Sequence, residues 1–452
     1  MPSVQRTISG WGRFLRAECN LYRPERVAEL SEIVKSGQQA KWIPRGCGRS
    51  YGDAALNGGH GVILLERLDR FLSFEPSTGL LRCEAGVRLA DIIAYFLPRG
   101  WFLPVTPGTK FCSIGACVAC DVHGKNHHRD GSLAYFVKEI SLLLPEGKLV
   151  RCSPQENPDL FRATAGGMGL TGIILDVEIY LRPVESAYIT VDYVRTRNLD
   201  ETLSTFQERD SRYLYSVGWL DCLAERQSFG RGVLMFGKHS KQEELPPSLA
   251  EKPLQTQRER PVGVPFDFPG FVLNKPSLKA FNLFYYRAHK TGNRLIVDYD
   301  KFFYPLDKIL HWNRIYGKKG FLQYQCVLPF DTGPDAVVRI LQNIKKAGAL
   351  PFLAVLKRMG AHSGGLLSFP VPGYTLALDF PVREGIFQAL AGLDQIVLAA
   401  GGRVYLAKDA CLRADVFKAM YPDADRWREI KASVDPQGVF SSDLARRLEL
   451  VR

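Results

Sequence analysis

The sequence predicts an α+β protein with more than one domain, and three observations lead to this fold class. The chain has 452 residues, more than one hydrophobic core usually organises. Segments with strand and helix patterns follow one another in an irregular order, without the strict βαβ repeat of a parallel sheet. Beyond residue 183 glycine clusters become rarer, while aromatic residues and strand patterns recur to about residue 402.

The composition is that of a globular protein, with 46% hydrophobic and 23% charged residues. No apolar run approaches the roughly 18 residues that a transmembrane helix needs. The amino terminus lacks the apolar core and the cleavage site of a signal peptide. Ten cysteines are scattered along the chain, several in apolar stretches, as expected of free thiols in a reducing compartment. We therefore expect a cytoplasmic protein.

The formal net charge is +12. Nucleic-acid binding would gather lysine and arginine on one element with aromatic residues between them, whereas here the basic residues are spread along the chain. We therefore expect no nucleic-acid partner. An ordinary basic surface accounts for the charge, and an anionic substrate or an anionic membrane surface is the alternative use.

Short helices and strands alternate in the first third of the chain. Residues 27–35 have apolar side chains at helical spacing, and the helix pattern of residues 89–97 is followed by helix-ending proline and glycine. Residues 173–181 alternate apolar and polar side chains, as in a strand with one face in water. The other expected elements are strands over 61–65 and 80–85, a hairpin over 140–152 and a short helix over 159–164.

The middle of the chain continues with strands and longer helices. Its proline-rich segment from 246 to 271 lacks a pattern and is expected to form a surface loop. Residues 321–328 and 374–380 alternate as strands, and residues 336–344 have the pattern of an amphipathic helix. This order supports the α+β class.

Two glycine-rich segments are the most informative feature of the chain. Residues 44–53 have the sequence PRGCGRSYGD, and a second segment runs from Pro104 to His128. Glycine lets the backbone come within hydrogen-bond distance of a ligand, because no Cβ blocks the approach. Successive free N–H groups then suit phosphate oxygens. Two such segments in one domain predict a long ligand with a diphosphate in its middle, hence a dinucleotide.

The spacing of the glycines disfavours nicotinamide and ATP folds. A G-x-G-x-x-G pattern occurs at residues 167–172, but a helix pattern precedes it and a strand pattern follows it. That order is the reverse of a Rossmann fingerprint. The loop at Gly46 has one residue too many for the same fingerprint, and no G-x-x-x-x-G-K-[ST] motif occurs.

These segments resemble the FAD-binding domain of the vanillyl-alcohol-oxidase superfamily, and within it the oxidase subunits of decaprenylphosphoryl-β-D-ribose 2′-epimerases. The string DVHGKNHH at 121–128 is highly specific for this likeness, which covers nearly the whole chain. Later strings that carry it are WNRIYG at 312–317, GFLQYQ at 320–325, LSFPVPG at 367–373, YLAKD at 405–409 and SDLARR at 442–447.

The resemblance implies a two-part FAD-binding domain of the PCMH type, formed by residues 1–184 and 403–452. A substrate-binding cap domain, built on an antiparallel sheet, would be inserted at residues 185–402. The carboxy-terminal part would be similar to that of D-arabinono-1,4-lactone oxidases. FAD would be held without a covalent link, because Tyr51 stands where covalent relatives often carry a histidine.

The same resemblance assigns site residues. The catalytic residues would be Lys408, His123 and Tyr51. The FAD-binding residues would be Arg45, Gly46, Cys47, Gly48, Arg49, Ser50, Tyr51, Pro107, Gly108, Thr109, Ser113, Gly115, Ala116, Cys120, His123, Gly124, Asn126, Gly169, Gly172, Ile173 and Tyr405. The substrate-binding residues would be Trp219, Tyr316, Gln323, Gln325, Lys357, Thr375 and Lys125.

Two roles stay open for Lys408, which the resemblance places at the flavin and close to the substrate. Its cation would stabilise negative charge that develops on the flavin. If it is sufficiently desolvated, its amine would instead help to remove the hydroxyl proton. Around it, glutamines suit pentose hydroxyls because each offers a donor and an acceptor, and Lys357 suits a phosphate diester.

The histidines and cysteines near residue 123 have two alternative interpretations. His123 and His127 are four residues apart, and zinc sites combine such residues with cysteines such as Cys117 and Cys120. Gly124 argues against a helix there, and no second ligand pair lies at the usual spacing, so no metal is expected. A thioredoxin-like role for the C-x-x-C pair is disfavoured, because the small residues just before it fit a close approach to FAD.

The activity implied by the resemblance is oxidation of the C2 hydroxyl of a polyprenyl-phosphoryl pentose to a 2-keto sugar, by hydride transfer to flavin N5. A separate NAD(P)H-dependent short-chain reductase would then reduce the ketone from the other face, which completes a 2′-epimerisation in cell-envelope arabinan biosynthesis. A quinone is the expected electron acceptor. A lipid substrate implies peripheral contact with the inner face of the membrane.

Two alternatives belong to other classes. An aldonolactone or alditol oxidase of the same superfamily would act on a soluble sugar, but such enzymes typically carry a His-Trp-Gly-Lys motif, and His-Trp at 311–312 is followed here by Asn313. A non-catalytic lipid-binding module would keep its ligand affinity when Lys408 is replaced. Two residues depart from the family pattern, because Thr375 and Ala377 stand where relatives have asparagine and cysteine. We expect this difference to affect which sugar or lipid the protein prefers.

Overall fold

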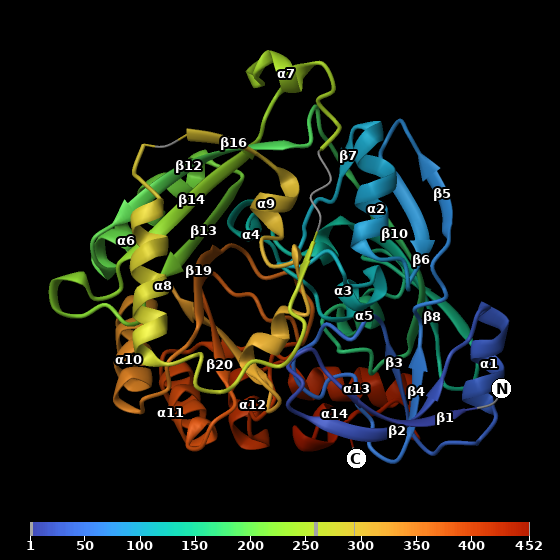
Figure 1. Ribbon diagram of the computed structural model, residues 1–452. Helices are drawn as coiled ribbons and strands as arrows, with labels where there is room; N and C mark the ends of the chain where they lie inside the picture. The colour runs from blue at the N-terminus through green and yellow to red at the C-terminus, as the bar shows by residue number, and fades with distance from the viewer. Residues whose placement is uncertain (1–2, 257–260, 293, 452) are drawn as a thin grey trace.

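The computed structural model describes residues 3–256, 261–292 and 294–451. Two groups of sheets lie side by side (Figure 1), one formed by the first 183 residues and the other by the middle of the chain. The carboxy-terminal helices α13 (Ala424–Val434) and α14 (Asp443–Arg447) lie beneath the first group. The α+β class with antiparallel sheets is confirmed.

The first group contains two main sheets. A four-stranded sheet has the order β1–β2–β4–β3, with β1 (Val4–Ser9) antiparallel to β2 (Arg16–Tyr22), and with β2 and β3 (Trp42–Arg45) both parallel to β4 (Gly61–Leu64). A five-stranded sheet is antiparallel throughout. Its order is β5 (Phe71–Glu75), β6 (Leu80–Glu84), β10 (Ile173–Tyr180), β8 (Val137–Leu143) and β9 (Leu149–Cys152).

Short helices connect these strands, and three of them lie where the sequence predicts helices, at 27–35, 89–97 and 159–164. Helix α1 (Val27–Lys35) buries Leu30, Ile33 and Val34 at helical spacing. The remaining elements are α2 (Leu89–Phe96), α3 (Ile114–Ala119), α4 (His127–Asp130), α5 (Pro158–Thr164) and the short pair β7 (Trp101–Phe102) with β11 (Arg182–Pro183). The G-x-G-x-x-G string at 167–172 follows α5 and precedes β10, in the order opposite to a Rossmann unit, as predicted.

An antiparallel sheet of eight strands dominates the second group. Its order is β16 (Arg294–Asp298), β12 (Tyr188–Thr196), β14 (Gly232–His239), β13 (Tyr215–Leu220), β19 (Leu353–Met359), β20 (Gly373–Pro381), β18 (Phe321–Pro329) and β21 (Arg403–Val404). Its long helices are α6 (Leu199–Arg209), α8 (Lys275–Ala288), α10 (Gly333–Lys346) and α11 (Ile386–Ala399), and its short elements are α7 (Pro247–Ala250), α9 (Tyr299–Phe303) and the parallel pair β15 (Val262–Gly263) with β17 (Ile309–Leu310).

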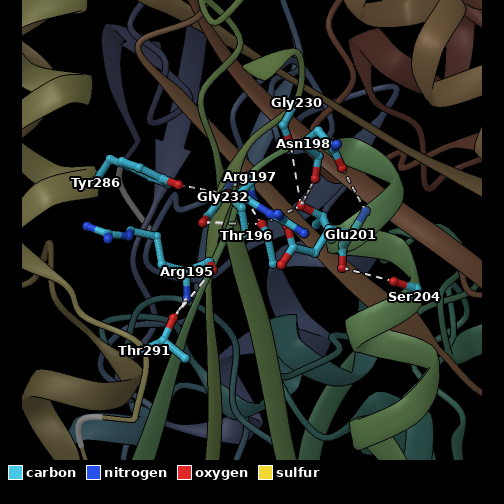
Figure 2. A network of polar contacts seen from close by, with 11 residues as sticks. Arg195, Thr196, Arg197, Asn198, Glu201, Ser204, Gly230, Gly232, Tyr286 and Thr291 are labelled. Carbon is cyan, nitrogen blue, oxygen red and sulfur yellow. Dashed lines mark hydrogen bonds and ion pairs between the residues drawn. The ribbon is translucent and has the colours of Figure 1, made fainter. Parts of the chain in front are cut away.

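A polar network fixes the end of β12 to helices α6 and α8 (Figure 2). The Thr196 hydroxyl lies 2.6 Å from that of Thr202, and the Asn198 side chain caps α6 by accepting from the Glu201 amide at 2.9 Å. The Tyr286 hydroxyl donates to the Thr196 carbonyl at 3.1 Å. Helix α8 is thereby attached to the sheet on one face.

The carboxy-terminal segment returns to the first group after α12 (Ala414–Met420). Trp427 of α13 is buried and donates its indole N–H to the Ala163 carbonyl at 2.8 Å, and the Trp42 amide donates to the Val439 carbonyl at 2.8 Å. The division of the chain at residues 184/185 and 402/403 stays a prediction. Strand β21 begins at the second of these boundaries, at residue 403, and pairs with β18 of the eight-stranded sheet.

All ten cysteines are free, as expected from their scatter in the sequence. Among the described residues, no helix combines the length and the apolar character that crossing a bilayer requires.

Candidate active site

One cavity is lined jointly by the amino-terminal sheets and the eight-stranded sheet. One wall consists of the glycine loop after β3, the start of α3 and the turn before β10; the other consists of β18, β19, β20 and the segment after β21. The predicted residues that line it are Arg45, Gly46, Cys47, Gly48, Arg49, Ser50, Tyr51, Pro107, Gly108, Thr109, Ser113, Gly115, Ala116, Cys120, His123, Gly169, Gly172, Gln323, Gln325, Lys357, Tyr405 and Lys408.

Three glycines of the first wall have no room for a side chain. A Cβ on Gly46 would overlap the Ser113 hydroxyl, and a Cβ on Gly115 would lie 2.6 Å from that of Ala85. Gly48 has a φ of +62°, a left-handed conformation that side chains disfavour. The two glycine-rich segments are therefore packed directly against each other, with their backbones on the cavity surface.

The hydroxyl of Ser113 is buried at the junction of these segments and has no hydrogen-bond partner in the described part of the chain. A buried polar atom without a partner is costly unless a ligand satisfies it. Ser113 also directly precedes the first residue of α3. This orphaned hydroxyl in a cradle of glycines fits the diphosphate of FAD.

His123 lies deep in the cavity wall and is held by the opposite sheet. The Gln325 amide donates to His123 Nε2 at 2.8 Å and to the Thr375 hydroxyl at 3.1 Å. This arrangement puts the ring proton on Nδ1, a buried nitrogen for which the described residues supply no partner. Burial, and then the Lys357 cation, lower the pKa of His123 well below its ordinary value, so the ring is neutral at physiological pH.

Lys408 faces the aromatic ring of Tyr51, with Nζ 3.8 Å from the ring centroid. Burial lowers the pKa of Lys408 to about 8, although the nearby Asp379 carboxylate opposes that shift. Asp379 is itself buried and accepts from Gln323 at 2.5 Å and from the Tyr316 hydroxyl at 3.4 Å. Its burial raises its pKa to about 6, so it is ionised at neutral pH.

The backbone fixes Lys408 relative to the first glycine loop. The Tyr51 amide donates to the Ala407 carbonyl at 3.1 Å. Arg447 of α14 bonds Asp53 at 2.8 and 2.9 Å and Asp409 at 2.9 Å. One guanidinium thus joins the glycine loop, the segment that carries Lys408 and the carboxy-terminal helix.

Two further buried lysines lie at or near this part of the cavity. Burial lowers the pKa of Lys357 to about 8 and that of Lys125 to about 7, where the Lys357 cation adds to the shift. Lys357 lines the cavity. Lys125 does not line it, and its ammonium donates to the Phe303 carbonyl at 3.1 Å.

Several predicted residues lie behind the wall. Asn126 is buried and donates to the Pro104 carbonyl at 2.8 Å, which fixes the second glycine segment. Trp219 of β13 is paired with Val355, a lining residue of β19. Together with Lys125, the predicted residues that do not line the cavity are Gly124, Asn126, Ile173, Trp219, Tyr316 and Thr375.

The sequence reasoning did not single out Asp379, Trp11 or Asp307. Asp379 orients Gln323 and Tyr316, while Trp11 and Asp307 line the cavity. The Asp307 carboxylate accepts from the Lys110 amide at 2.9 Å. The alternation of residues 374–380 could have placed Asp379 beside its β18 partner Gln323, given the register of the two strands.

The geometry bears on the two alternative interpretations of the residues near His123, a zinc site and a thioredoxin-like cysteine pair. Ser132 lies 3.1 Å from Nε2 of His127, and the Gly360 amide donates to its Nδ1 at 3.0 Å, so both ring nitrogens have protein partners. Burial raises the pKa of Cys120 to about 12, which is the opposite of a reactive redox thiol.

Comparison with known proteins identifies the class. The family described as FAD binding domain matches residues 20–153, and that described as D-arabinono-1,4-lactone oxidase matches residues 378–448. The structure of a xylooligosaccharide oxidase from Myceliophthora thermophila C1, in complex with xylobiose, is similar with a TM-score of 0.70 at 17% identity, over 97% of this chain and 95% of that one. The fold and the cavity thus define an FAD-dependent oxidoreductase with a PCMH-type FAD-binding domain.

Full-length relatives place the chain more narrowly. It is 38% identical over 456 residues to decaprenylphosphoryl-beta-D-ribose oxidase of Mycolicibacterium smegmatis. This alignment covers 100% of the chain and 99% of that protein. An uncharacterised protein of Streptomyces coelicolor is 35% identical over 369 residues, or 80% of this chain and 99% of that protein. The chain belongs to the family of the decaprenylphosphoryl-β-D-ribose oxidases.

Proposed function

We propose that the protein oxidises the C2 hydroxyl of a polyprenyl-phosphoryl pentose to a 2-keto sugar. The observation that carries this proposal is that His123, Gln325 and Lys408 line one cavity together with the glycine cradle, with Gln325 of β18 donating to His123 at 2.8 Å. A sugar carbon held between them would face the cofactor. The similarity to decaprenylphosphoryl-beta-D-ribose oxidase over the full length supports the same substrate class.

The FAD-binding residues would be those of the glycine cradle, above all Gly46, Gly48 and Ser113, and bound FAD would supply the two-electron acceptor for the hydride of C2. Tyr51 stands on this wall where covalent relatives often have a histidine, so we propose a non-covalent complex. Boiling in trichloroacetic acid should release all of the yellow colour into the supernatant.

His123, Gln325, Lys408 and Lys357 would orient the sugar and move its proton. The neutral His123 offers the Nδ1 hydrogen to a sugar oxygen, and Gln325 keeps that ring in place. Lys408, with its pKa near 8, is partly neutral at physiological pH and would accept the hydroxyl proton as the hydride leaves. Lys357 would face the phosphate diester as a cation.

The product ketone requires a second enzyme if the net reaction is an epimerisation. We propose a separate NAD(P)H-dependent short-chain reductase as that partner, and a quinone as the final electron acceptor. The lipid substrate and the net charge of +12 support peripheral contact with the membrane from the cytoplasmic side.

Anaerobic titration tests the function. Polyprenyl-phosphoryl ribose should bleach the absorption of the FAD-loaded protein at the stoichiometry of the flavin, whereas aldonolactones and alditols should leave it yellow. Rapid bleaching by those soluble sugars, with peroxide formed in air, would instead assign the lactone or alditol oxidase activity. A protein that cannot be loaded with FAD would reject both.

A further inference from the structure

The exposed phenylalanines of the protein gather on one segment. Among the described residues, four of the five phenylalanines with high exposure lie between 266 and 284, and the fifth is Phe387. Phe266, Phe271 and Phe284 are 62%, 74% and 72% exposed. Large aromatic side chains in water are costly, and a cluster of them marks a contact surface. We call the segment 262–290 the aromatic-basic surface.

The backbone of this surface is held firmly, although Phe266, Phe271 and Phe284 are largely exposed. Arg13 forms a two-pronged pair with Asp267 at 2.5 and 3.1 Å, and the Phe268 amide donates to the Arg314 carbonyl at 2.9 Å. Arg383 donates to the carbonyls of Gly270 and Leu273 at 3.1 and 2.5 Å. The loop therefore presents its phenylalanines in a fixed arrangement, at a low entropic cost for binding.

Helix α8 continues the surface with one attached and one unpartnered face. Leu278 and Asn282 are buried, and the Asn282 amide donates to Asp221 at 2.7 Å. Tyr286 attaches the same helix to β12 (Figure 2). Phe284 is 72% exposed, whereas Phe281, one helical turn earlier, is 39% exposed and its ring lies 5.5 Å from that of Phe352.

The charge of the surface complements an anionic layer. Residues 275–292 contain Lys275, Lys279, Arg287 and Lys290 and no aspartate or glutamate. The nearby Glu225 is already paired with Lys345 at 3.1 Å. A helix with aromatic residues on one side and only basic charges beside them is typical of segments that lie in the interface of an anionic bilayer.

The surface adjoins residues that line the cavity. Strand β15 of the loop pairs with β17, which lies between the lining residues Leu306 and Trp312. One apolar cluster then runs from Leu278 of α8 through Trp312 to Tyr51, which faces Lys408. In Figure 1 the loop before α8 crosses the face of the molecule between the two groups of sheets. A lipid tail could thus stay in an apolar layer while its sugar reaches the catalytic residues.

We propose that the aromatic-basic surface docks onto an anionic phospholipid bilayer and seats the cavity entrance at the level of the headgroups. The proposal rests on the proposed function, because a lipid-linked sugar is what gives this docking its purpose. It adds the contact surface itself, which neither the site nor the family assigns.

Vesicle sedimentation of the FAD-loaded protein tests the proposal. The wild type should co-sediment with vesicles of phosphatidylcholine and phosphatidylglycerol in equal parts, and poorly with phosphatidylcholine alone. The double variants F271S/F284S and K279E/R287E should each lower the vesicle partition coefficient by about tenfold or more. The matched control, K148E/L149S, changes an exposed lysine and a 62% exposed leucine on the β8–β9 hairpin and should bind as the wild type does.

Three results would overturn the docking surface. The first is equal vesicle binding by the wild type and the two double variants of the aromatic-basic surface, and the second is no binding of the wild type to anionic vesicles. The third is a wild-type dimer that these variants convert to a monomer, which would assign the surface to a second copy of the chain. Flavin content and far-ultraviolet circular dichroism of each variant establish that it is folded. If the vesicle results hold while polyprenyl-phosphoryl ribose fails to bleach the flavin, the surface stands and the proposed function falls.

Discussion

The two walls of the cavity present different chemical groups to a ligand. The cofactor wall is backbone, exposed by glycines such as Gly46 and Gly48 and lacking space for side chains. The substrate wall consists of side chains that project from neighbouring antiparallel strands, among them Gln323, Gln325 and Lys357. A backbone wall tolerates little change in volume, whereas a side-chain wall can change its specificity by single substitutions.

The largest effect is expected on the backbone wall. In Gly46→Val, the new side chain must displace the Ser113 hydroxyl, and FAD affinity should fall about 10³-fold or more. The ratio of absorbance at 450 nm to that at 280 nm measures the loss. Gly392→Ala is the matched control, because Gly392 lies in α11 with ordinary van der Waals space around it. A fully yellow Gly46→Val protein would contradict the assignment of this wall.

The next effect lies on the side-chain wall. Lys408→Met should retain FAD, since the glycine cradle is untouched, but should slow anaerobic flavin reduction by about 10²- to 10³-fold. Lys357→Met should instead raise the KM for a phosphorylated substrate by about tenfold and leave kcat nearly unchanged. Stopped-flow absorbance separates the two constants. Equal losses of kcat in both variants would contradict the division of roles.

The third prediction concerns pH. If neutral Lys408 accepts the proton, the rate of flavin reduction should rise as pH increases through about 8, because the amine is protonated below its pKa. In Asp379→Asn the carboxylate that raises the pKa of Lys408 is lost, so the midpoint should move to lower pH, and the rate should fall about tenfold as Gln323 and Tyr316 lose their charged acceptor.

The control for this pH profile is Asp394→Asn. Asp394 is also buried, with its pKa raised to about 7, but it accepts from Tyr324 and does not line the cavity. Its replacement should leave the midpoint in place. A wild-type rate that falls with increasing pH would assign Lys408 the charge-stabilising role.

The smallest effect is expected at Ser113. Ser113→Ala removes a buried hydroxyl without a partner, so the Tm of the apoprotein should rise slightly. The same change should weaken FAD binding about fivefold, because the diphosphate loses one donor. Thermal melts of the apoprotein and of the FAD-loaded protein measure the expected rise in Tm and the expected loss of stabilisation by FAD. A Tm decrease in the apoprotein would show that the hydroxyl is already satisfied.

The difference between the walls also explains what the sequence could predict. Glycine-rich loops are contiguous in sequence, so the cradle around Gly46 and Gly115 could be predicted from local pattern and chain order. The contact between His123 and Gln325 joins residues 202 positions apart and depends on strand register, which no local pattern reports. The resemblance supplied these residues, but it placed Tyr316 and Thr375 on a wall that they support from behind.

The triple junction at Arg447 has a consequence for how a ligand arrives. This guanidinium and the Tyr51–Ala407 hydrogen bond tie the segment that carries Lys408 to the first glycine loop, and all of these residues belong to the predicted FAD-binding domain, so a displacement of the cap domain would leave the contacts in place. Lys408 would therefore keep its position beside Tyr51 while a ligand enters the cavity.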